Sequence, residues 1–303
     1  MSVIALTGGT GFVGGATIAV ALAAGHQVRA LTRRTQPPRQ GITWVEGALD
    51  RPDSLARLCA GADAALHIAG VVNAPDRAGF VAGNITGTAA MITAARGAGI
   101  SRFIHVSSLA AREPGLSNYG WSKAEAEARV AASGLEWIMV RPPAVYGPGD
   151  TEMLDLFRMA RRGLVLLPPR GRISVVHVTD LARLLVALAA GAGDRHAVYE
   201  VDDGEPQGWS HAGFADALGE AVGRKVRTLH APKLALYMAA RGDRLLRGGK
   251  AKLTPDRARY LAHSDWTADR AHRPPRDLWY PDIPTRQGLA NTARWYRAQG
   301  WIK

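Results

Sequence analysis

The sequence is poor in cysteine, in acidic residues and in long apolar runs. Cys59 is the single cysteine among 303 residues, which excludes an internal disulfide and fits a reducing compartment. No eighteen consecutive residues are apolar, so we expect no membrane-spanning helix. The first apolar run, residues 3–6, leads directly into glycines, so we expect a strand there and no secretory signal. The histidines lack the spacing of metal ligands, so we expect no metal.

Glycines spaced by threes follow this first predicted strand. In the segment Thr7-Gly8-Gly9-Thr10-Gly11-Phe12-Val13-Gly14, the glycines stand between an apolar strand and an alanine-rich helix. A glycine at 8 permits a tight turn, one at 11 lets the backbone approach a pyrophosphate, and one at 14 lets the helix pack on the strand. A second strand at residues 27–32 completes a βαβ unit. We predict a dinucleotide site with contacts from Gly8, Thr10, Gly11, Phe12, Val13 and Gly14.

The end of the second predicted strand indicates which dinucleotide binds. NAD sites usually carry a carboxylate at this place, whereas NADP sites offer arginine to the additional phosphate. Here Thr32 is followed by Arg33 and Arg34, with no carboxylate. Guanidinium groups form charge-assisted, often bidentate bonds with phosphate. We therefore predict NADPH in preference to NADH, with Arg33 as the main contact and Arg34 as its helper; two exposed loop arginines are the alternative.

Residues suited to carbonyl chemistry follow the strand predicted at residues 102–106. Ser107 and Ser108 end this strand, and Tyr119 and Lys123 come shortly after them. Residues four apart on a helix share one face, and an ammonium beside a phenol favours the phenolate. Tyr119 is then a usable general acid for a developing alkoxide. We expect Ser108 to bond the substrate oxygen, Lys123 also to hold the nicotinamide ribose, and the cofactor to supply hydride.

These motifs together resemble the extended, epimerase/dehydratase-like type of the short-chain dehydrogenase/reductase superfamily. The resemblance covers most of the first two hundred residues. It implies that Asn84 belongs to the catalytic group near Lys123. The cofactor-site residues that it adds are Leu49, Ala69, Gly70, Ser107, Pro142 and Val145. The family often has an aspartate where Ala48 stands, so we expect Leu49 to supply only packing to the adenine.

Strands and helices alternate through the first half of the chain. This pattern predicts an α/β fold, a Rossmann-type doubly wound parallel sheet with helices on both faces. We assign residues 1–150 to the NADP-binding domain and expect residues 173–201 to return to its sheet. Residues 151–172 and 202–303 are assigned mainly to a smaller, interleaved C-terminal substrate lobe and tail. Pairing into a homodimer through the Tyr119 helix is a habit of the superfamily, and the sequence leaves the oligomeric state of this chain open.

Basic residues are concentrated in one segment. The net charge is +12, and residues 224–259 hold eleven Lys or Arg against two Asp. Within them, residues 232–252 contain a basic amphipathic helix, a type that binds anionic bilayers. A lid over the substrate and a site for an anionic substrate are the alternatives, and nothing resembles a nucleic-acid module. We expect a cytoplasmic protein, peripheral on the inner face of the membrane.

The sequence favours a ketoreductase acting on a hydrophobic small molecule. The tail, with four of the eight tryptophans after residue 260, is similar to that of bacterial reductases of sphingolipid synthesis, which implies a 3-oxo-sphingoid or ceramide-type substrate. An NAD-dependent sugar-nucleotide epimerase is the alternative, but it usually shows an acidic residue in place of Thr32. A dehydratase tends to carry an Asp-Glu pair where Leu109 and Ala110 stand. A non-catalytic nucleotide-binding subunit would not need Ser108, Tyr119 and Lys123 together.

Overall fold

The chain divides into two compact units. The computed structural model describes residues 1–248 and 253–302. Unit 1 consists of Met1–Pro142, Val178–Val201 and Arg270–Tyr280. Unit 2 consists of the described residues within Pro143–His177, Asp202–Asp269 and Pro281–Lys303. Each unit is therefore built from segments that lie far apart in the sequence.

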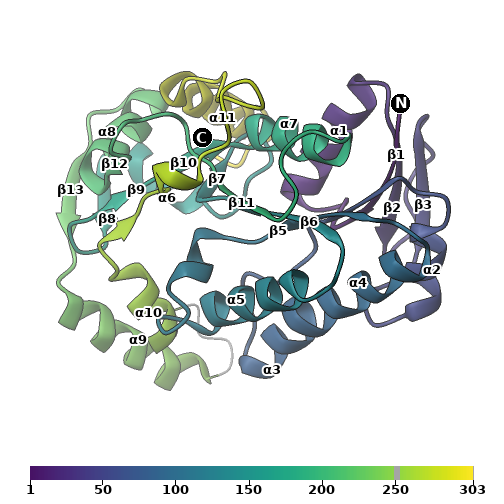
Figure 1. Ribbon diagram of the computed structural model, residues 1–303. Coiled ribbons are helices and arrows are strands. Elements are labelled where there is room, and N and C mark those ends of the chain that lie inside the picture. The colour runs from purple at the N-terminus through teal and green to yellow at the C-terminus, as the bar shows by residue number, and fades with distance from the viewer. Residues whose placement is uncertain (249–252, 303) are drawn as a thin grey trace. The chain divides into compact units, whose positions relative to one another are not determined.

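A seven-stranded parallel sheet forms the centre of unit 1 (Figure 1). Its strands are β1 Val3–Thr7, β2 Gln27–Thr32, β3 Ile42–Glu46, β4 Ala64–His67, β5 Arg102–Val106, β6 Glu136–Arg141 and β11 Ala197–Glu200. They lie in the order β11-β6-β5-β4-β1-β2-β3. Both β2 and β4 pair with β1, so the order of the strands reverses there. Open α/β sheets bind ligands at such a switch point, outside the carboxyl ends of the strands.

Helices cover both faces of this sheet. Figure 1 shows α1 and α7 on one face and α2, α4 and α5 on the other. The helices are α1 Phe12–Ala23, α2 Pro52–Cys59, α3 Arg77–Phe80, η1 Val81–Thr86, α4 Gly87–Gly97, η2 Leu109–Arg112, α5 Asn118–Ala131, α7 Val178–Ala189 and η4 Arg270–His272. The strands are buried from both sides, which explains why β4 is apolar throughout except at His67. The predicted Rossmann-type doubly wound fold is confirmed.

The helical run Arg77–Gly97 joins α3, η1 and α4, and its middle part is a π-helix. By length and composition alone this run could cross a membrane, but 44% of its apolar window is buried inside the protein. Helix α4 packs against α2 and α5, as a core helix does. The π-helical turn before it contains Asn84, and such turns occur frequently at functional sites.

Unit 2 packs three small sheets against helices. In its described part the strand pairings are β7 with β10, β8 with β13, and β9 between β12 and β14. The strands are β7 Ala144–Tyr146, β8 Leu164–Leu167, β9 Arg172–Ile173, β10 Val175–His177, β12 Trp209–Ser210, β13 Arg227–His230 and β14 Asp265–Trp266. The helices are α6 Leu154–Arg161, α8 His211–Val222, α9 Lys233–Arg247, α10 Pro255–Leu261 and α11 Thr285–Ala298.

Aromatic side chains from the tail help to fill the core of unit 2. Tyr296 is fully buried and meets Phe157 edge to face, with ring centroids 5.0 Å apart. Trp301 stacks on Tyr296 at 5.6 Å. The C-terminal tryptophan Trp301 and the helix α11 thus pack within unit 2. Helix α9 matches the predicted basic helix, although residues 249–252 of the predicted segment lie outside the described residues.

Candidate active site

The glycine loop joins β1 to α1 and has the shape of a phosphate cradle. Gly8 has φ +80°, and a Cβ there would lie 2.8 Å from the Ala69 nitrogen. A Cβ on Gly14 would lie 2.0 Å from the Gly8 carbonyl oxygen, so helix and loop could not approach as they do. Gly11, Thr10 and the first turn of α1 leave their surface accessible, with Phe12 and Val13 half-buried. The free N–H groups of a helix start attract anions, so this loop fits a dinucleotide pyrophosphate.

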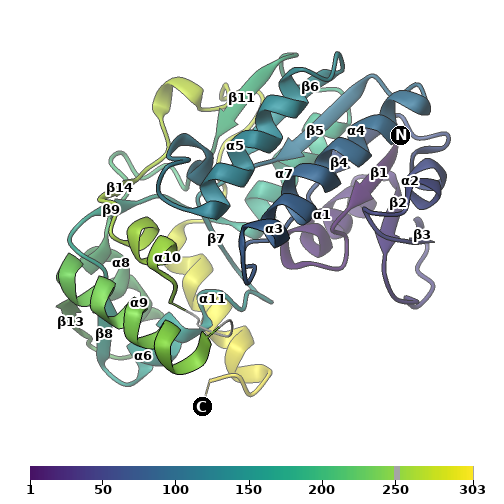
Figure 2. The same ribbon diagram turned by 90° about the horizontal axis from the view of Figure 1, so that it is seen from below.

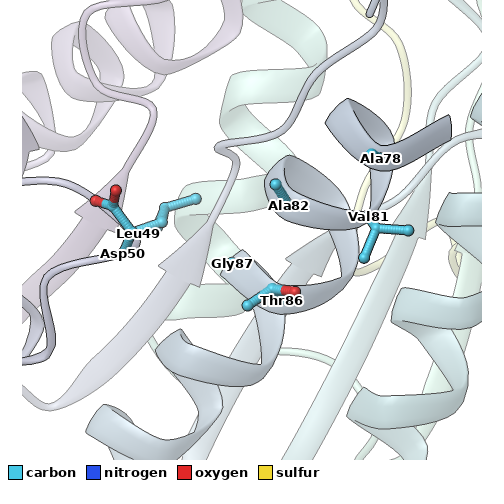
Figure 3. Close-up of a pocket in the computed structure, with 7 residues that line it drawn as sticks. All are labelled: Leu49, Asp50, Ala78, Val81, Ala82, Thr86 and Gly87. Atoms are coloured by element: carbon cyan, nitrogen blue, oxygen red, sulfur yellow. The ribbon is translucent and has the colours of Figure 1, made fainter. Parts of the chain in front are cut away.

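An apolar pocket lies in unit 1 at the end of β3. Its volume is about 320 Å³, and Figure 3 shows Leu49 and Asp50 on one side and residues of α3, η1 and α4 on the other. The remaining lining residues are Ala78, Val81, Ala82, Thr86 and Gly87. Leu49 packs closely on Gly87, where a Cβ would lie 2.7 Å from its methyl carbon. Such lining suits a flat aromatic base, and Leu49 offers it packing, as expected from the sequence beside Ala48.

Arg33 and Arg34 follow β2 directly, and both side chains are exposed. The Thr32 hydroxyl shapes this turn, since it donates to the Arg34 carbonyl oxygen at 2.7 Å. Two arginines therefore follow the carboxyl end of β2, and the last residue of this strand is Thr32 and not a carboxylate. This arrangement suits an additional phosphate on the cofactor ribose.

Tyr119 and Lys123 lie on α5, and Ser108 lies at the end of β5. Ser117 caps α5 by accepting the Gly120 N–H at 3.0 Å, so the helix begins at Asn118. Lys123 is 5% exposed, and its Nζ donates to the Val106 carbonyl oxygen at 2.9 Å. Burial lowers the pKa of Lys123 to about 8, while the charge of Glu127 opposes that shift. The lysine is thereby held beside the carboxyl end of β5.

Ser108 and Tyr119 are half-buried and so remain partly accessible in unit 1. The Ser108 hydroxyl accepts the Ala110 N–H at 3.2 Å, which leaves its own proton available for another acceptor. Ser107, its neighbour, is buried, and its N–H donates to the Val140 carbonyl oxygen at 2.7 Å. Ser108 is therefore the serine of the two that is suited to bonding a substrate oxygen.

Asn84 and Gly70 meet Lys123 at this end of the sheet. A Cβ on Gly70 would lie 2.9 Å from Asn84 Oδ1 and 3.4 Å from Lys123 Nζ. Asn84 exchanges two hydrogen bonds with the backbone of Val71 and donates to the Ser122 hydroxyl at 2.9 Å. The bare, exposed Gly70 thus leaves the lysine ammonium open on that side. A ribose hydroxyl group fits this gap. Asn84 holds the backbone of Val71 and the side chain of Ser122 beside it.

A buried chain of hydrogen bonds runs beneath these residues. The Thr88 hydroxyl donates to the Asn84 carbonyl oxygen at 2.6 Å, so it must accept from His67 Nε2, 3.0 Å away. His67 Nδ1 then carries no proton and accepts from the Thr7 hydroxyl at 2.7 Å. Burial and the charge of Lys123 lower the pKa of His67 to about 3, in agreement with a neutral ring. The chain ties the end of β1 to the π-helical turn.

A second polar network anchors α5 to the sheet. Arg141 on β6 donates to both carboxylate oxygens of Glu127, at 2.8 and 2.6 Å. Arg141 and Arg112 also pair with the fully buried Glu200 on β11, at 3.3 and 3.0 Å. The pair with Glu127 ties the middle of α5 to β6, and Glu200 links Arg141 to β11. Glu127 therefore both positions the helix and raises the pKa of the lysine four residues before it.

The structure brings most of the predicted residues into unit 1. Pro142 is buried at the end of β6, and its carbonyl oxygen accepts the Leu109 N–H at 3.1 Å. Val145 belongs to β7 in unit 2, where it pairs with Val176 of β10. No cluster of metal-binding side chains occurs among the residues that the structure describes. Sequence reasoning assigned no role to His67, Thr7 and Thr88, because their partners lie 60 and 21 residues away in the chain.

Comparison with known proteins is consistent with this geometry. Residues 4–201 match the model of the NAD dependent epimerase/dehydratase family. Ceramide reductase of Caulobacter vibrioides is 37% identical, covering 99% of this chain and 96% of that protein. The 2-alkyl-3-oxoalkanoate reductase of Stenotrophomonas maltophilia is 30% identical, covering 94% and 97%.

Solved structures support the fold independently. The crystal structure of gox2253 superimposes with a TM-score of 0.79 at 23% identity, covering 100% of this chain and 99% of that one. MoeE5 in complex with UDP-glucuronic acid and NAD gives a TM-score of 0.75 at 21% identity, with 99% and 100% coverage. At these identities the likeness concerns the fold.

Proposed function

Because the chain belongs to the NAD-dependent epimerase/dehydratase family and is an NAD(P)-dependent oxidoreductase, we propose that it is an NADPH-dependent ketoreductase acting on a lipid-type carbonyl substrate. The observation that carries the proposal is the placement of Lys123 beside the open Gly70, on the helix that also bears Tyr119. A family fold alone would not require this arrangement.

Residues of unit 1 would hold the cofactor. The glycine loop with Thr10, Phe12 and Val13 binds the pyrophosphate, and the Leu49 pocket and Ala69 receive the adenine side. Arg33, helped by Arg34, binds the additional ribose phosphate that distinguishes NADPH from NADH. Gly70, Lys123, Ser107 and Pro142 line the nicotinamide side. When bound, the cofactor supplies the hydride.

The chain's own residues supply the proton and orient the carbonyl. Ser108 donates a hydrogen bond to the carbonyl oxygen and so stabilises the negative charge that develops there. Tyr119 gives its phenolic proton to that oxygen as the alcohol forms. The Lys123 ammonium stabilises the resulting phenolate through charge, and Asn84 keeps the lysine side of the site in place. Bulk water then restores the proton to Tyr119.

The names of two relatives support the proposed substrate class. One is named for ceramide and the other for a 3-oxo acid that carries an alkyl chain, and both matches span nearly the whole chain. A 3-oxo-sphingoid or ceramide-type ketone fits both names. We further propose that the protein pairs as a homodimer through α5, and that it works in the cytoplasm at the inner face of the membrane, contacting it through the basic segment 232–252.

An assay of NADPH oxidation by absorbance tests the proposal. The purified protein in detergent is given a 3-oxo sphingoid amide, with a UDP-sugar as the control substrate. We expect turnover of the lipid with NADPH preferred over NADH. No turnover of the lipid, together with tightly bound NAD carried through purification, would favour the sugar-nucleotide epimerase. No turnover of any substrate, together with a nucleotide retained through purification, would favour a non-catalytic subunit.

A further inference from the structure

Exposed apolar side chains gather in one part of unit 2. Among the described residues, eleven large apolar side chains are exposed, and eight of these belong to β8, β13 and α9. They are Leu164, Leu166, Leu229, Leu234, Tyr237, Met238, Leu245 and Leu246. Single exposed apolar residues are ordinary on protein surfaces, whereas a concentration of them indicates an interaction site.

The strand pair β8–β13 turns leucines outward. Val165 and Leu167 of β8 are buried in the core of unit 2, so the alternate residues Leu164 and Leu166 face away from it. Leu164 and Leu166 are 46% and 57% exposed. On the parallel partner strand, Leu229 lies opposite Leu166 and is 56% exposed. One face of this two-stranded sheet is therefore apolar and uncovered in the described part of the chain.

Helix α9 also presents its apolar stripe away from the core. Leu234, Met238 and Leu245 fall within about 40° of one another around the helix axis, and they are 69%, 66% and 86% exposed. The opposite side carries the fully buried Ala240 and the half-buried Leu236. A lid helix packed on a core would bury its leucines. Here the apolar stripe instead lies toward solvent.

Exposed cations accompany these leucines. Arg227 lies on the outward face of β13, and Arg241 lies beside the apolar stripe of α9. Arg224, Lys225 and Lys233 are exposed in the same stretch of chain. Asp243 pairs with Arg247 at 3.2 Å, which leaves the stretch strongly basic. Only Ala231 and Pro232 separate β13 from α9, and Figure 2 shows the helix beside α10 at this edge of unit 2.

We propose that the outward faces of β8, β13 and α9 form a docking face for an anionic lipid bilayer. Leucines would enter the boundary between head groups and acyl chains while Arg227 and Arg241 meet lipid phosphates. The charge favours this occupant over a second copy of the chain, because two such basic faces would repel each other. The inference deepens the proposed function by naming where its hydrophobic substrate is collected. Binding is nevertheless measurable without turnover.

Co-sedimentation of the full-length protein with vesicles tests this inference. We expect binding to vesicles of phosphatidylglycerol and phosphatidylcholine, weakened by salt, and about tenfold weaker binding to phosphatidylcholine alone. The double variant Leu245→Glu/Leu246→Glu, the variant Leu166→Glu and the variant Arg241→Glu should each weaken binding by about tenfold or more. Tyr280→Glu and Arg96→Glu, at exposed positions of unit 1, serve as controls and should bind like the original protein.

Two further measurements separate docking from folding and from chemistry. They are the melting temperature of every variant and its rate of NADPH oxidation with a short water-soluble ketone. We expect the melting temperature and the rate to be unchanged in the α9 variants. Equal binding by the α9 and control variants, or no preference for the anionic lipid, would overturn the docking face. The docking face would also be overturned if the protein did not bind vesicles and instead formed a dimer in solution that Leu245→Glu dissociates. If the original protein binds vesicles but does not reduce the ketone, the proposed function is overturned and the docking face is not.

Discussion

The Thr7 hydroxyl donates to His67 Nδ1 across 2.7 Å, linking the last residue of β1 to the last residue of β4. The other ring nitrogen meets Thr88, so both nitrogens of the buried ring are used and the neutral form is required. A second proton on His67 would point at the proton of Thr7. The ring thus joins the strand that leads into the glycine loop to the helix that follows Asn84.

This relationship predicts a loss of stability in mild acid. The pKa of His67 is about 3 in the folded protein, below its ordinary value of 6.5. As the pH falls below 6.5, His67 therefore takes up a proton in the unfolded chain but not in the folded protein. The contribution of the neutral ring to the free energy of unfolding is complete above pH 6.5 and is lost as the pH falls toward 3. The slope approaches about 1.4 kcal/mol per pH unit for this group.

The measurement compares the free energy of unfolding between pH 7 and pH 5 in the original protein and in His67→Gln. We expect a shallower fall in the variant, because glutamine does not titrate. The control is His272→Gln at an exposed position, which should keep the original slope. Identical slopes in all three proteins would show that His67 is not held neutral.

Gly14 and Gly15 offer a matched test of the glycine loop. A Cβ on Gly14 would lie 2.0 Å from the Gly8 carbonyl oxygen, whereas a Cβ on Gly15 would have its nearest neighbour at 3.9 Å. Gly14→Ala should cost about 1–3 kcal/mol of stability and abolish nucleotide binding, because the loop must shift. Gly15→Ala should stabilise α1 by about 0.5–1 kcal/mol. Melting temperatures with and without NADPH would measure both effects, and similar results for the two variants would contradict the cradle.

The parts of the fold and of the candidate site that depend on patterns local in the sequence were predictable. The glycine loop and the Tyr119–Lys123 pair depend on short spacings along the chain, and the sheet follows from apolar strands alternating with helices. The His67 chain was not predictable, because it joins residues 60 positions apart. Nor was the outward leucine face of β8, since the sequence Leu-Val-Leu-Leu does not say which leucines are buried. The π-helical turn at Asn84 has no comparable sequence signal either.

Arg33 should discriminate between the two nicotinamide cofactors. A charge-assisted bond to phosphate is worth about 1.5–3 kcal/mol, so Arg33→Ala should raise the KM for NADPH about tenfold to a hundredfold. The KM for NADH should change little, because NADH lacks that phosphate. Arg34→Ala should have a smaller effect, and Arg39→Ala, at another exposed position of the same loop, none. A parallel rise for both cofactors in Arg33→Ala would show that the arginine does not bind the phosphate.

Lys123 should set the alkaline limit of activity. Its pKa of about 8 means that the ammonium, and with it the support for the Tyr119 phenolate, is lost above that pH. We therefore expect kcat/KM for ketone reduction to fall above about pH 8. Tyr119→Phe should lower kcat by about a hundredfold or more at every pH, with nucleotide binding nearly unchanged.

Glu127 allows this assignment to be tested without removing the lysine. Its charge raises the pKa of Lys123, so Glu127→Gln should move the alkaline limit to lower pH, while Arg141 keeps its pairing with Glu200. Glu125→Gln, at an exposed position of the same helix, should leave the profile unchanged. Structural damage alone would lower the rate without moving the limit, so the shift distinguishes an electrostatic effect from simple loss of packing. An unmoved limit in Glu127→Gln would assign the alkaline titration to a group other than Lys123.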